Sequence, residues 1–210
     1  MNKKYFIKSP ESDNKGSGPF TQKTSNEGKH KTIMNKKKLI IFTDSGDTII
    51  DESTQIYGEE NPQIVQRADF IENAGEVLKK LHDDGYTIAL VADGEWDSFR
   101  NVYRENGLGY CFDAWIVSEK VGMQKPARIM FETAMQKLGL TDDDKKRIVM
   151  IGNNLRKDIG GANNFGITSI WLDWSPRYFH EFEEESWKPD YRISHPDELI
   201  DLINKLENEL

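Results

Sequence analysis

Four short polar segments, each rich in residues that can do chemistry, occur in order along this chain. Asp44 and Asn153 come soon after apolar runs, Ala92 ends another such run, and Lys125 precedes a proline. A carboxylate held at the end of a buried strand, opposite a bound cation, can attack phosphorus and form an aspartyl-phosphate. A lysine near such a carboxylate offsets the negative charges that converge there. These residue types therefore point to phosphoryl transfer.

The elements that must position these residues alternate between strands and helices. Apolar runs predict strands over residues 39–43, 87–92, 114–118, 148–151 and 168–172. The spacing of apolar residues predicts helices over 74–84, 96–106, 127–138, 158–165 and 196–207. This alternation indicates an α/β fold with a doubly wound parallel sheet. Because such sheets bind ligands beyond the carboxyl ends of their strands, Asp44, Ala92 and Asn153 should meet at one edge.

Taken together, the four segments resemble the haloacid dehalogenase (HAD) superfamily of aspartate-nucleophile phosphatases, over roughly residues 37–207. Asp44-Ser45-Gly46-Asp47-Thr48 is similar to the first motif of that family, Asp-x-Asp-Gly-Thr. The segment from Ser118 to Pro126 is similar to the third motif, and residues 152–162 match the length of the fourth, Gly-Asp-x-x-x-x-Asp-Ile-x-Gly-Ala. The resemblance implies a HAD-like core with a Rossmann-like sheet, in which the strand before Asp44 is central.

The resemblance also implies roles for particular residues. Asp44 would be the nucleophile, and Lys125 would neutralise Asp44 and the incoming phosphate, with Lys120 as a competing candidate. Ala92, Asp93 and Gly94 occupy the phosphate-binding second motif, where the backbone N–H groups of Asp93 and Gly94 are expected to cradle an anion.

The metal expected from the resemblance is Mg²⁺, the cofactor of the family. Its ligands would be Asp44, the carbonyl of Gly46, Asn153 and Asp158. These are the hard oxygen donors that Mg²⁺ prefers.

Three of the motif positions are altered. Gly46 replaces the family's general acid and base, Ala92 replaces a hydroxyl that donates to phosphate, and Asn153 replaces a Mg²⁺-binding aspartate. Loss of a general acid typically costs about 10²–10⁴ in rate, and loss of one aimed donor about 10²–10³. We therefore expect a Mg²⁺-dependent phosphatase that is weak or restricted in substrate, with acyl or aryl phosphates least affected.

The same segments allow other interpretations. Each segment alone also fits an ordinary turn, loop, surface lysine or acidic residue at a helix N-terminus. A degenerate, non-catalytic HAD domain that binds a phosphorylated ligand or a protein partner is the main alternative. A receiver-like signalling domain also pairs a phosphorylatable aspartate with a lysine, but the long fourth motif after Lys125 argues against it.

Composition indicates one globular domain preceded by a tail. Hydrophobic residues make up 37% and charged residues 30% of the 210 residues. Residues 1–35 lack apolar periodicity and are predicted to be a disordered basic tail, with the HAD-like hydrolase domain over 36–210. Residues 1–38 hold ten lysines and three acids, a net charge of +7. Because the formal net charge of the whole chain is −8, the remaining residues carry a net charge of −8 − 7 = −15. That acidic body makes nucleic acid an unexpected partner.

We expect a cytoplasmic enzyme whose active site is open. No apolar run is long enough to span a membrane, and Cys111 is the single cysteine. Only 21 residues separate Thr48 from Phe70, too few for a full cap, so we expect a capless or minimally capped domain. An open site suits a phosphorylated substrate on a macromolecule, or closure by a partner subunit. The aromatic residues near the C-terminus either form a stacking surface or cover the sheet edge: Trp171, Trp174, Tyr178, Trp187 and Tyr191.

Overall fold

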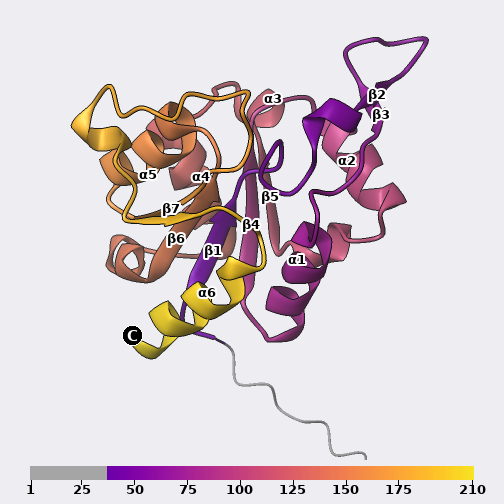
Figure 1. The fold of residues 1–210 in the computed structure, drawn as a ribbon. Coiled ribbons are helices and arrows are strands. Elements are labelled where there is room, and N and C mark those ends of the chain that lie inside the picture. Colours follow the sequence, from indigo (N-terminus) through magenta and orange to yellow (C-terminus); the bar gives the residue numbers. More distant parts are fainter. Residues whose placement is uncertain (1–36) are drawn as a thin grey trace, which may run out of the picture. The chain divides into compact units, whose positions relative to one another are not determined.

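The computed structural model describes residues 37–210, and the predicted tail over 1–35 lies outside the described residues. Six parallel strands form one sheet in the order β5-β4-β1-β6-β7-β8 (Figure 1). The strands are β1 (Ile40–Thr43), β4 (Thr87–Ala92), β5 (Ala114–Val117), β6 (Ile148–Gly152), β7 (Thr168–Leu172) and β8 (Tyr191–Ile193). This confirms the predicted doubly wound parallel sheet with the strand before Asp44 near its centre.

Alternation along the strands sends side chains to two cores, one on each face of the sheet. Ile41 of β1 packs in the larger core with helices α1 (Ala74–Asp83), α2 (Trp96–Glu105) and α6 (Glu198–Asn208). Its neighbours Ile40 and Phe42 pack on the other face with α4 (Arg128–Leu138) and α5 (Gly160–Phe165). All four residues of β1 are buried, which explains why this central strand reads as an uninterrupted apolar run.

Several short elements were not anticipated from the sequence. An antiparallel hairpin of β2 (Ile56–Tyr57) and β3 (Val65–Arg67) follows a 3₁₀ turn, η1 (Glu52–Thr54), and projects at the upper right of Figure 1. The other short helices are α3 (Ser118–Val121), η2 (Gly109–Cys111), η3 (Asp142–Arg147), the π-helical turn η4 (Leu155–Ile159) and η5 (Glu185–Trp187). The short turn η1 and this hairpin lie between β1 and α1, in agreement with a minimal cap.

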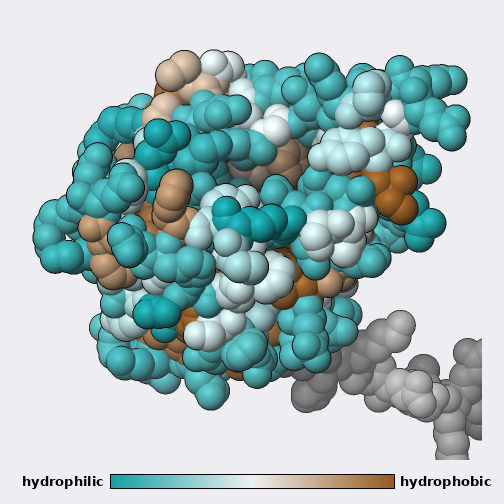
Figure 2. Space-filling view, turned by 45° about the horizontal axis from the view of Figure 1, so that its top comes forward, coloured by the Kyte–Doolittle hydropathy of each residue, from teal (hydrophilic) through white to brown (hydrophobic). Residues whose placement is uncertain are grey.

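The surface around the carboxyl ends of the strands is mainly hydrophilic, and hydrophobic residues are visible only in small separate areas (Figure 2). Two of the C-terminal aromatic residues, Trp171 and Trp187, are buried with Leu155 and Ile159 in a small cluster beside β7. These two residues are therefore not part of an exposed stacking surface. Among residues 37–210, no helix has the length and apolar character that crossing a membrane requires.

Candidate active site

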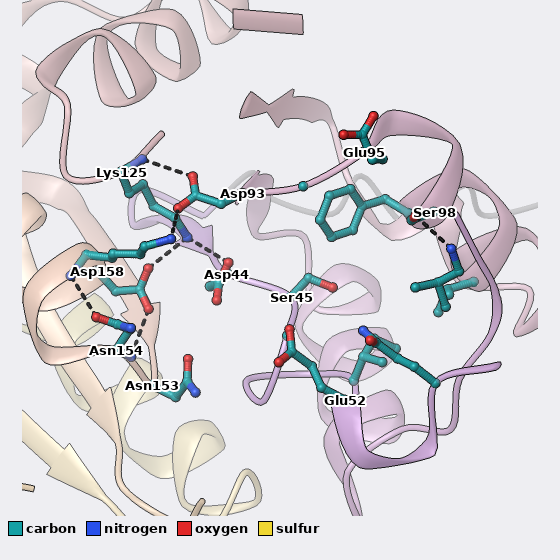
Figure 3. Close-up of a pocket in the computed structure, with 18 of the residues that line it drawn as sticks. Asp44, Ser45, Glu52, Asp93, Glu95, Ser98, Lys125, Asn153, Asn154 and Asp158 are labelled. Atoms are coloured by element: carbon teal, nitrogen blue, oxygen red, sulfur yellow. Dashed lines mark hydrogen bonds and ion pairs between the residues drawn. The ribbon is translucent and has the colours of Figure 1, made fainter. Parts of the chain in front are cut away.

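Asp44, Lys125 and Asp158 meet at the carboxyl ends of the strands (Figure 3). Lys125 Nζ lies 2.6 Å from Asp44 Oδ1 and 2.7 Å from Asp158 Oδ1, and it donates to the carbonyl of Val91 at 2.7 Å. The lysine side chain is 1% exposed, whereas that of Asp44 is 15% exposed and faces the pocket. The structure therefore brings together the three charged residues that the sequence assigned to one site. Lys120 pairs with Glu119 on the surface instead.

The charges of this cluster shift one another's ionisation. Burial raises the pKa of Asp44 from 3.8 to about 7; Lys125 opposes this rise and Asp158 adds to it. Burial alone would lower the pKa of Lys125, but the charges of Asp158 and Asp44 outweigh it and raise that pKa. The ammonium group is thus charged at neutral pH, and it holds one oxygen of the candidate nucleophile in a fixed direction.

The second motif contributes the carboxylate of Asp93, which follows the position of the missing hydroxyl. Asp93 Oδ1 accepts the backbone N–H of Lys125 at 2.9 Å, and its Oδ2 accepts Lys157 Nζ at 2.9 Å. The backbone N–H of Gly94 already donates to Ser118 Oγ at 2.9 Å, so it does not point at an anion as we expected. Ala92 is fully buried and has no polar side-chain atom. The cation at this rim of the pocket is Lys157, which we did not single out in the sequence although it precedes Asp158.

The fourth motif folds so that Asp158 turns back toward the strand. Asn154 N–H donates to Asp158 Oδ2 at 3.0 Å, and the Asn154 side chain accepts Lys157 N–H at 2.9 Å within the π-helical turn. A β-carbon on Gly152 would overlap the side chain of Asp158, so glycine is required at this position. Local hydrogen bonding thus sets the direction of Asp158.

Asn153 is 3% exposed and has an incompletely satisfied amide. Its Oδ1 lies 3.4 Å from Thr48 Oγ1, while its Nδ2 has no hydrogen-bond partner among the described residues. A buried amide nitrogen without a partner is costly. Rotating the amide by 180° would exchange its oxygen and nitrogen, so that the oxygen would stand at the position without a partner. One amide atom of Asn153 is therefore available to a ligand.

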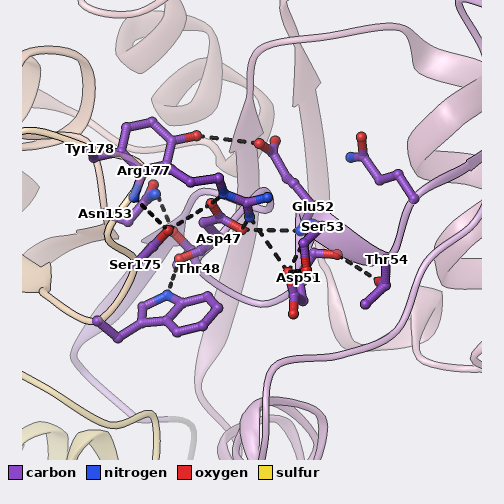
Figure 4. A network of polar contacts seen from close by, with 12 residues as sticks. Asp47, Thr48, Asp51, Glu52, Ser53, Thr54, Asn153, Ser175, Arg177 and Tyr178 are labelled. Carbon is purple, nitrogen blue, oxygen red and sulfur yellow. Dashed lines mark hydrogen bonds and ion pairs between the residues drawn. The ribbon is translucent and has the colours of Figure 1, made fainter.

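A second polar network lies beside the first motif (Figure 4). Asp47 is fully buried, and its carboxylate accepts the backbone N–H of Glu52 at 3.0 Å, Ser175 Oγ at 3.1 Å and Arg177 Nε at 2.8 Å. Tyr178 OH donates to Glu52 Oε2 at 3.3 Å. Burial, with the charge of Asp47, raises the pKa of Glu52.

These residues surround a pocket of about 310 Å³ that both polar and apolar side chains line. The charged wall consists of Asp44, Asp93, Lys125, Lys157 and Asp158, and Glu52 and Tyr178 also line the space. Its apolar wall is made by Ile50, Val65, Phe99 and Val102. The hairpin contributes Tyr57 as well.

The donor set at the strand ends meets part of what Mg²⁺ requires. Among residues 37–210 no three His, Cys, Asp or Glu side chains are grouped closely enough to hold a metal by themselves. Asp44 and Asn153 nonetheless offer a carboxylate and an amide with an unused position. Mg²⁺ is commonly held by one or two carboxylates together with substrate phosphates rather than by an all-protein cage. The residues present fit a metal shared with a bound phosphate, and the predicted contributions of the Gly46 carbonyl and of Asp158 stay predictions.

Comparison with known proteins identifies the family. A model of the haloacid dehalogenase-like hydrolases matches residues 13–172, so the chain belongs to that family. It is 26% identical over 136 residues to glyceraldehyde 3-phosphate phosphatase of Methanopyrus kandleri, a match covering 63% of this chain and 55% of the relative. It is 32% identical over 119 residues to pyrimidine 5'-nucleotidase YjjG of Escherichia coli, covering 56% of this chain and 50% of the relative. The chain thus spans about half the length of these relatives.

Solved structures agree on the fold. An uncharacterized protein from Listeria monocytogenes serotype 4b superimposes with a TM-score of 0.61 at 23% identity, covering 80% of this chain and 99% of that one. A HAD phosphatase from Thermococcus onnurineus gives a TM-score of 0.62 at 18% identity, covering 79% and 97%. At these identities the likeness shows the architecture of the HAD-like core and nothing further.

Proposed function

We propose that this protein hydrolyses phosphate monoesters through an aspartyl-phosphate on Asp44. The observation that carries the proposal is the contact of Lys125 with both Asp44 and Asp158 inside a pocket at the strand ends. Family membership supports the reaction class, since matched relatives bear the names of a sugar-phosphate phosphatase and a nucleotidase. Their substrates are not carried over to this chain.

The side chains present perform distinct parts of this reaction. Lys125 holds Asp44 Oδ1, which directs the carboxylate so that its other oxygen attacks phosphorus. When Asp44 is ionised, Lys125 and Lys157 face three carboxylates, those of Asp44, Asp93 and Asp158, so the cluster then has one net negative charge before a phosphate enters. That repulsion is a reason to expect a cation in the working site.

Mg²⁺ is the cation that we propose, held by Asp44 and Asn153 together with phosphate oxygens. When bound it would neutralise the charge of the phosphate and act as a Lewis acid. Asn153 supplies an uncharged ligand, so the affinity for Mg²⁺ should be lower than with a carboxylate at this position. The weak or restricted activity expected from Gly46 and Ala92 remains part of the proposal.

A turnover assay with p-nitrophenyl phosphate and Mg²⁺, comparing wild type with Asp44→Asn, tests the function. We expect turnover by wild type and its loss in the variant, while Asp142→Asn, on an exposed turn, provides the matched control. Acid-quenched wild type should carry one phosphoryl group on the peptide containing Asp44, seen by mass spectrometry. Phosphate binding without turnover or phosphorylation would instead support the non-catalytic alternative.

A further inference from the structure

Glu52 occupies the space that a side chain at position 46 would fill. A β-carbon placed on Gly46 would overlap Glu52 Oε1 and lie 2.7 Å from Glu52 Cδ. Position 46 is where the family motif carries its second aspartate, and here it has no side chain. The carboxylate missing from the motif is thus replaced in space by one that comes six residues later in the sequence.

The carboxylate of Glu52 is fixed by contacts at both ends of the residue. Its backbone N–H donates to Asp47 Oδ1 at 3.0 Å, and Asp51 caps the same short turn by accepting Ser53 N–H at 2.8 Å. Tyr178 OH holds Oε2 at 3.3 Å. The other oxygen, Oε1, is the one that lies against Gly46, in the pocket that Asp44 also lines (Figure 3). Catalytic groups need such restraint, because small misplacements are costly in rate.

We propose that Glu52 is the general acid and base of this site and takes the place of the carboxylate that Gly46 cannot supply. This inference rests on the proposed function. In the first step an oxygen of Asp44 bonds to phosphorus, the bond from phosphorus to the ester oxygen breaks, and the carboxyl of Glu52 gives its proton to that oxygen. The products are an alcohol and the aspartyl-phosphate, and Glu52 is left as a carboxylate.

In the second step Glu52 accepts a proton from water while the water oxygen bonds to phosphorus. The bond from phosphorus to Asp44 breaks, phosphate leaves, and both the Asp44 carboxylate and the Glu52 carboxyl are regenerated. The proton lost in the first step is regained in the second, so no further reactant is needed. If Glu52 had a purely structural role, substituting it would cause a packing defect. Such a defect would lower the rate for all substrates by the same factor, whatever their leaving group.

The first test compares two leaving groups in wild type and Glu52→Gln. Glycerol 2-phosphate releases an alkoxide that must be protonated, whereas p-nitrophenyl phosphate releases a stable anion. We expect Glu52→Gln to lower kcat/KM for the alkyl ester by about 10²–10⁴ and to change that for the aryl ester by less than about tenfold. The control is Glu95→Gln, which removes the carboxylate of another, exposed residue that lines the pocket. This variant should change kcat/KM for both substrates by one common factor.

The second test places a carboxylate at position 46 of the first motif and removes the one at position 52. Gly46→Asp alone should clash with Glu52, whereas the double variant Gly46→Asp/Glu52→Ala removes the clash and should recover hydrolysis of the alkyl ester at least tenfold over Glu52→Ala. Equal loss for both substrates in Glu52→Gln, or no recovery in the double variant, overturns the role of Glu52 while leaving the proposed function standing. Absence of any turnover by wild type overturns both, and the phosphorylation assay on Asp44 identifies that case separately.

Discussion

Replacing Asp47 by glycine should destabilise this protein, although glycine is the residue that the family motif carries there. Asp47 has a φ of +48°, a left-handed conformation that glycine adopts without steric cost. On backbone grounds alone the substitution should be neutral or favourable. The side chain argues the other way, because its carboxylate is fully buried and accepts hydrogen bonds from Glu52, Ser175 and Arg177.

The magnitudes decide between the two effects. Replacing a residue in the left-handed conformation by glycine stabilises the folded state by roughly 1–2 kcal/mol at most. The gain is smaller for Asp, which tolerates this conformation. Glycine also increases the entropy of the unfolded chain, which removes roughly 0.4–1 kcal/mol of that gain. Removing one partner of a buried ion pair costs about 3–5 kcal/mol, and we discount this because Arg177 is 39% exposed. We therefore expect Asp47→Gly to lower the free energy of unfolding by about 2–3 kcal/mol.

Urea unfolding followed by circular dichroism measures this loss as a lower midpoint at an unchanged slope. Asn73→Gly is the matched control, since Asn73 has a φ of +65° and its side chain makes no capping hydrogen bond. That variant should stay within about 0.5 kcal/mol of wild type. If Asp47→Gly proved as stable as wild type, the network around Asp47 would not contribute as argued here.

Three further predictions concern the metal, the nucleophile and the tail. Asn153→Asp should tighten Mg²⁺ binding in calorimetric titrations, because it adds a charged ligand; equal affinity in both proteins would remove Asn153 from the proposed ligands. In metal-free protein, the contribution of Asp44 to stability should fall by up to about 4 kcal/mol as pH rises from about 4 to about 7, since the folded state keeps a proton on Asp44 that the unfolded state releases. Asp44→Asn should flatten that part of the pH profile of the melting temperature, and an unaltered profile would contradict the raised pKa. Deletion of residues 1–33, which lack apolar periodicity in the sequence, should leave the melting temperature unchanged.

The fold was predictable because the central strands are buried on both faces. The strands β1, β4 and β6 contain buried residues only, so their apolar runs are uninterrupted and easily recognised. By contrast β8 has three residues, one of them exposed, and β2 is exposed throughout. Such short segments have no periodicity that would distinguish them from loops, and they form because a neighbouring strand pairs with them.

The charged core of the site was predictable for a related reason. Asp44 and Asp158 lie within motifs whose spacing is fixed by the strand and turn that carry them. Glu52, Tyr178 and Arg177 lie outside the motifs. The positions of Glu52 and Arg177 depend on tertiary contacts with Asp47, and Tyr178 in turn contacts Glu52. Only Glu52 is close in sequence to a motif, and nothing in its local pattern indicates that its side chain folds back onto Gly46.

Two changes in the first motif, at positions 46 and 47, have a single structural explanation. Position 46 has lost a carboxylate and position 47 has gained one, but the gained carboxylate is buried away from the pocket and cannot replace the lost one directly. It acts instead on the segment that follows, because it binds the backbone N–H of Glu52 and holds Arg177 beside Tyr178, which contacts the carboxylate of Glu52. A substitution at position 47 should therefore impair whatever Glu52 does, even though Asp47 does not line the pocket. The motif residues alone do not reveal this arrangement. Position 46 has no carboxylate, but the carboxylate of Glu52 lies close to the space that a side chain at position 46 would fill.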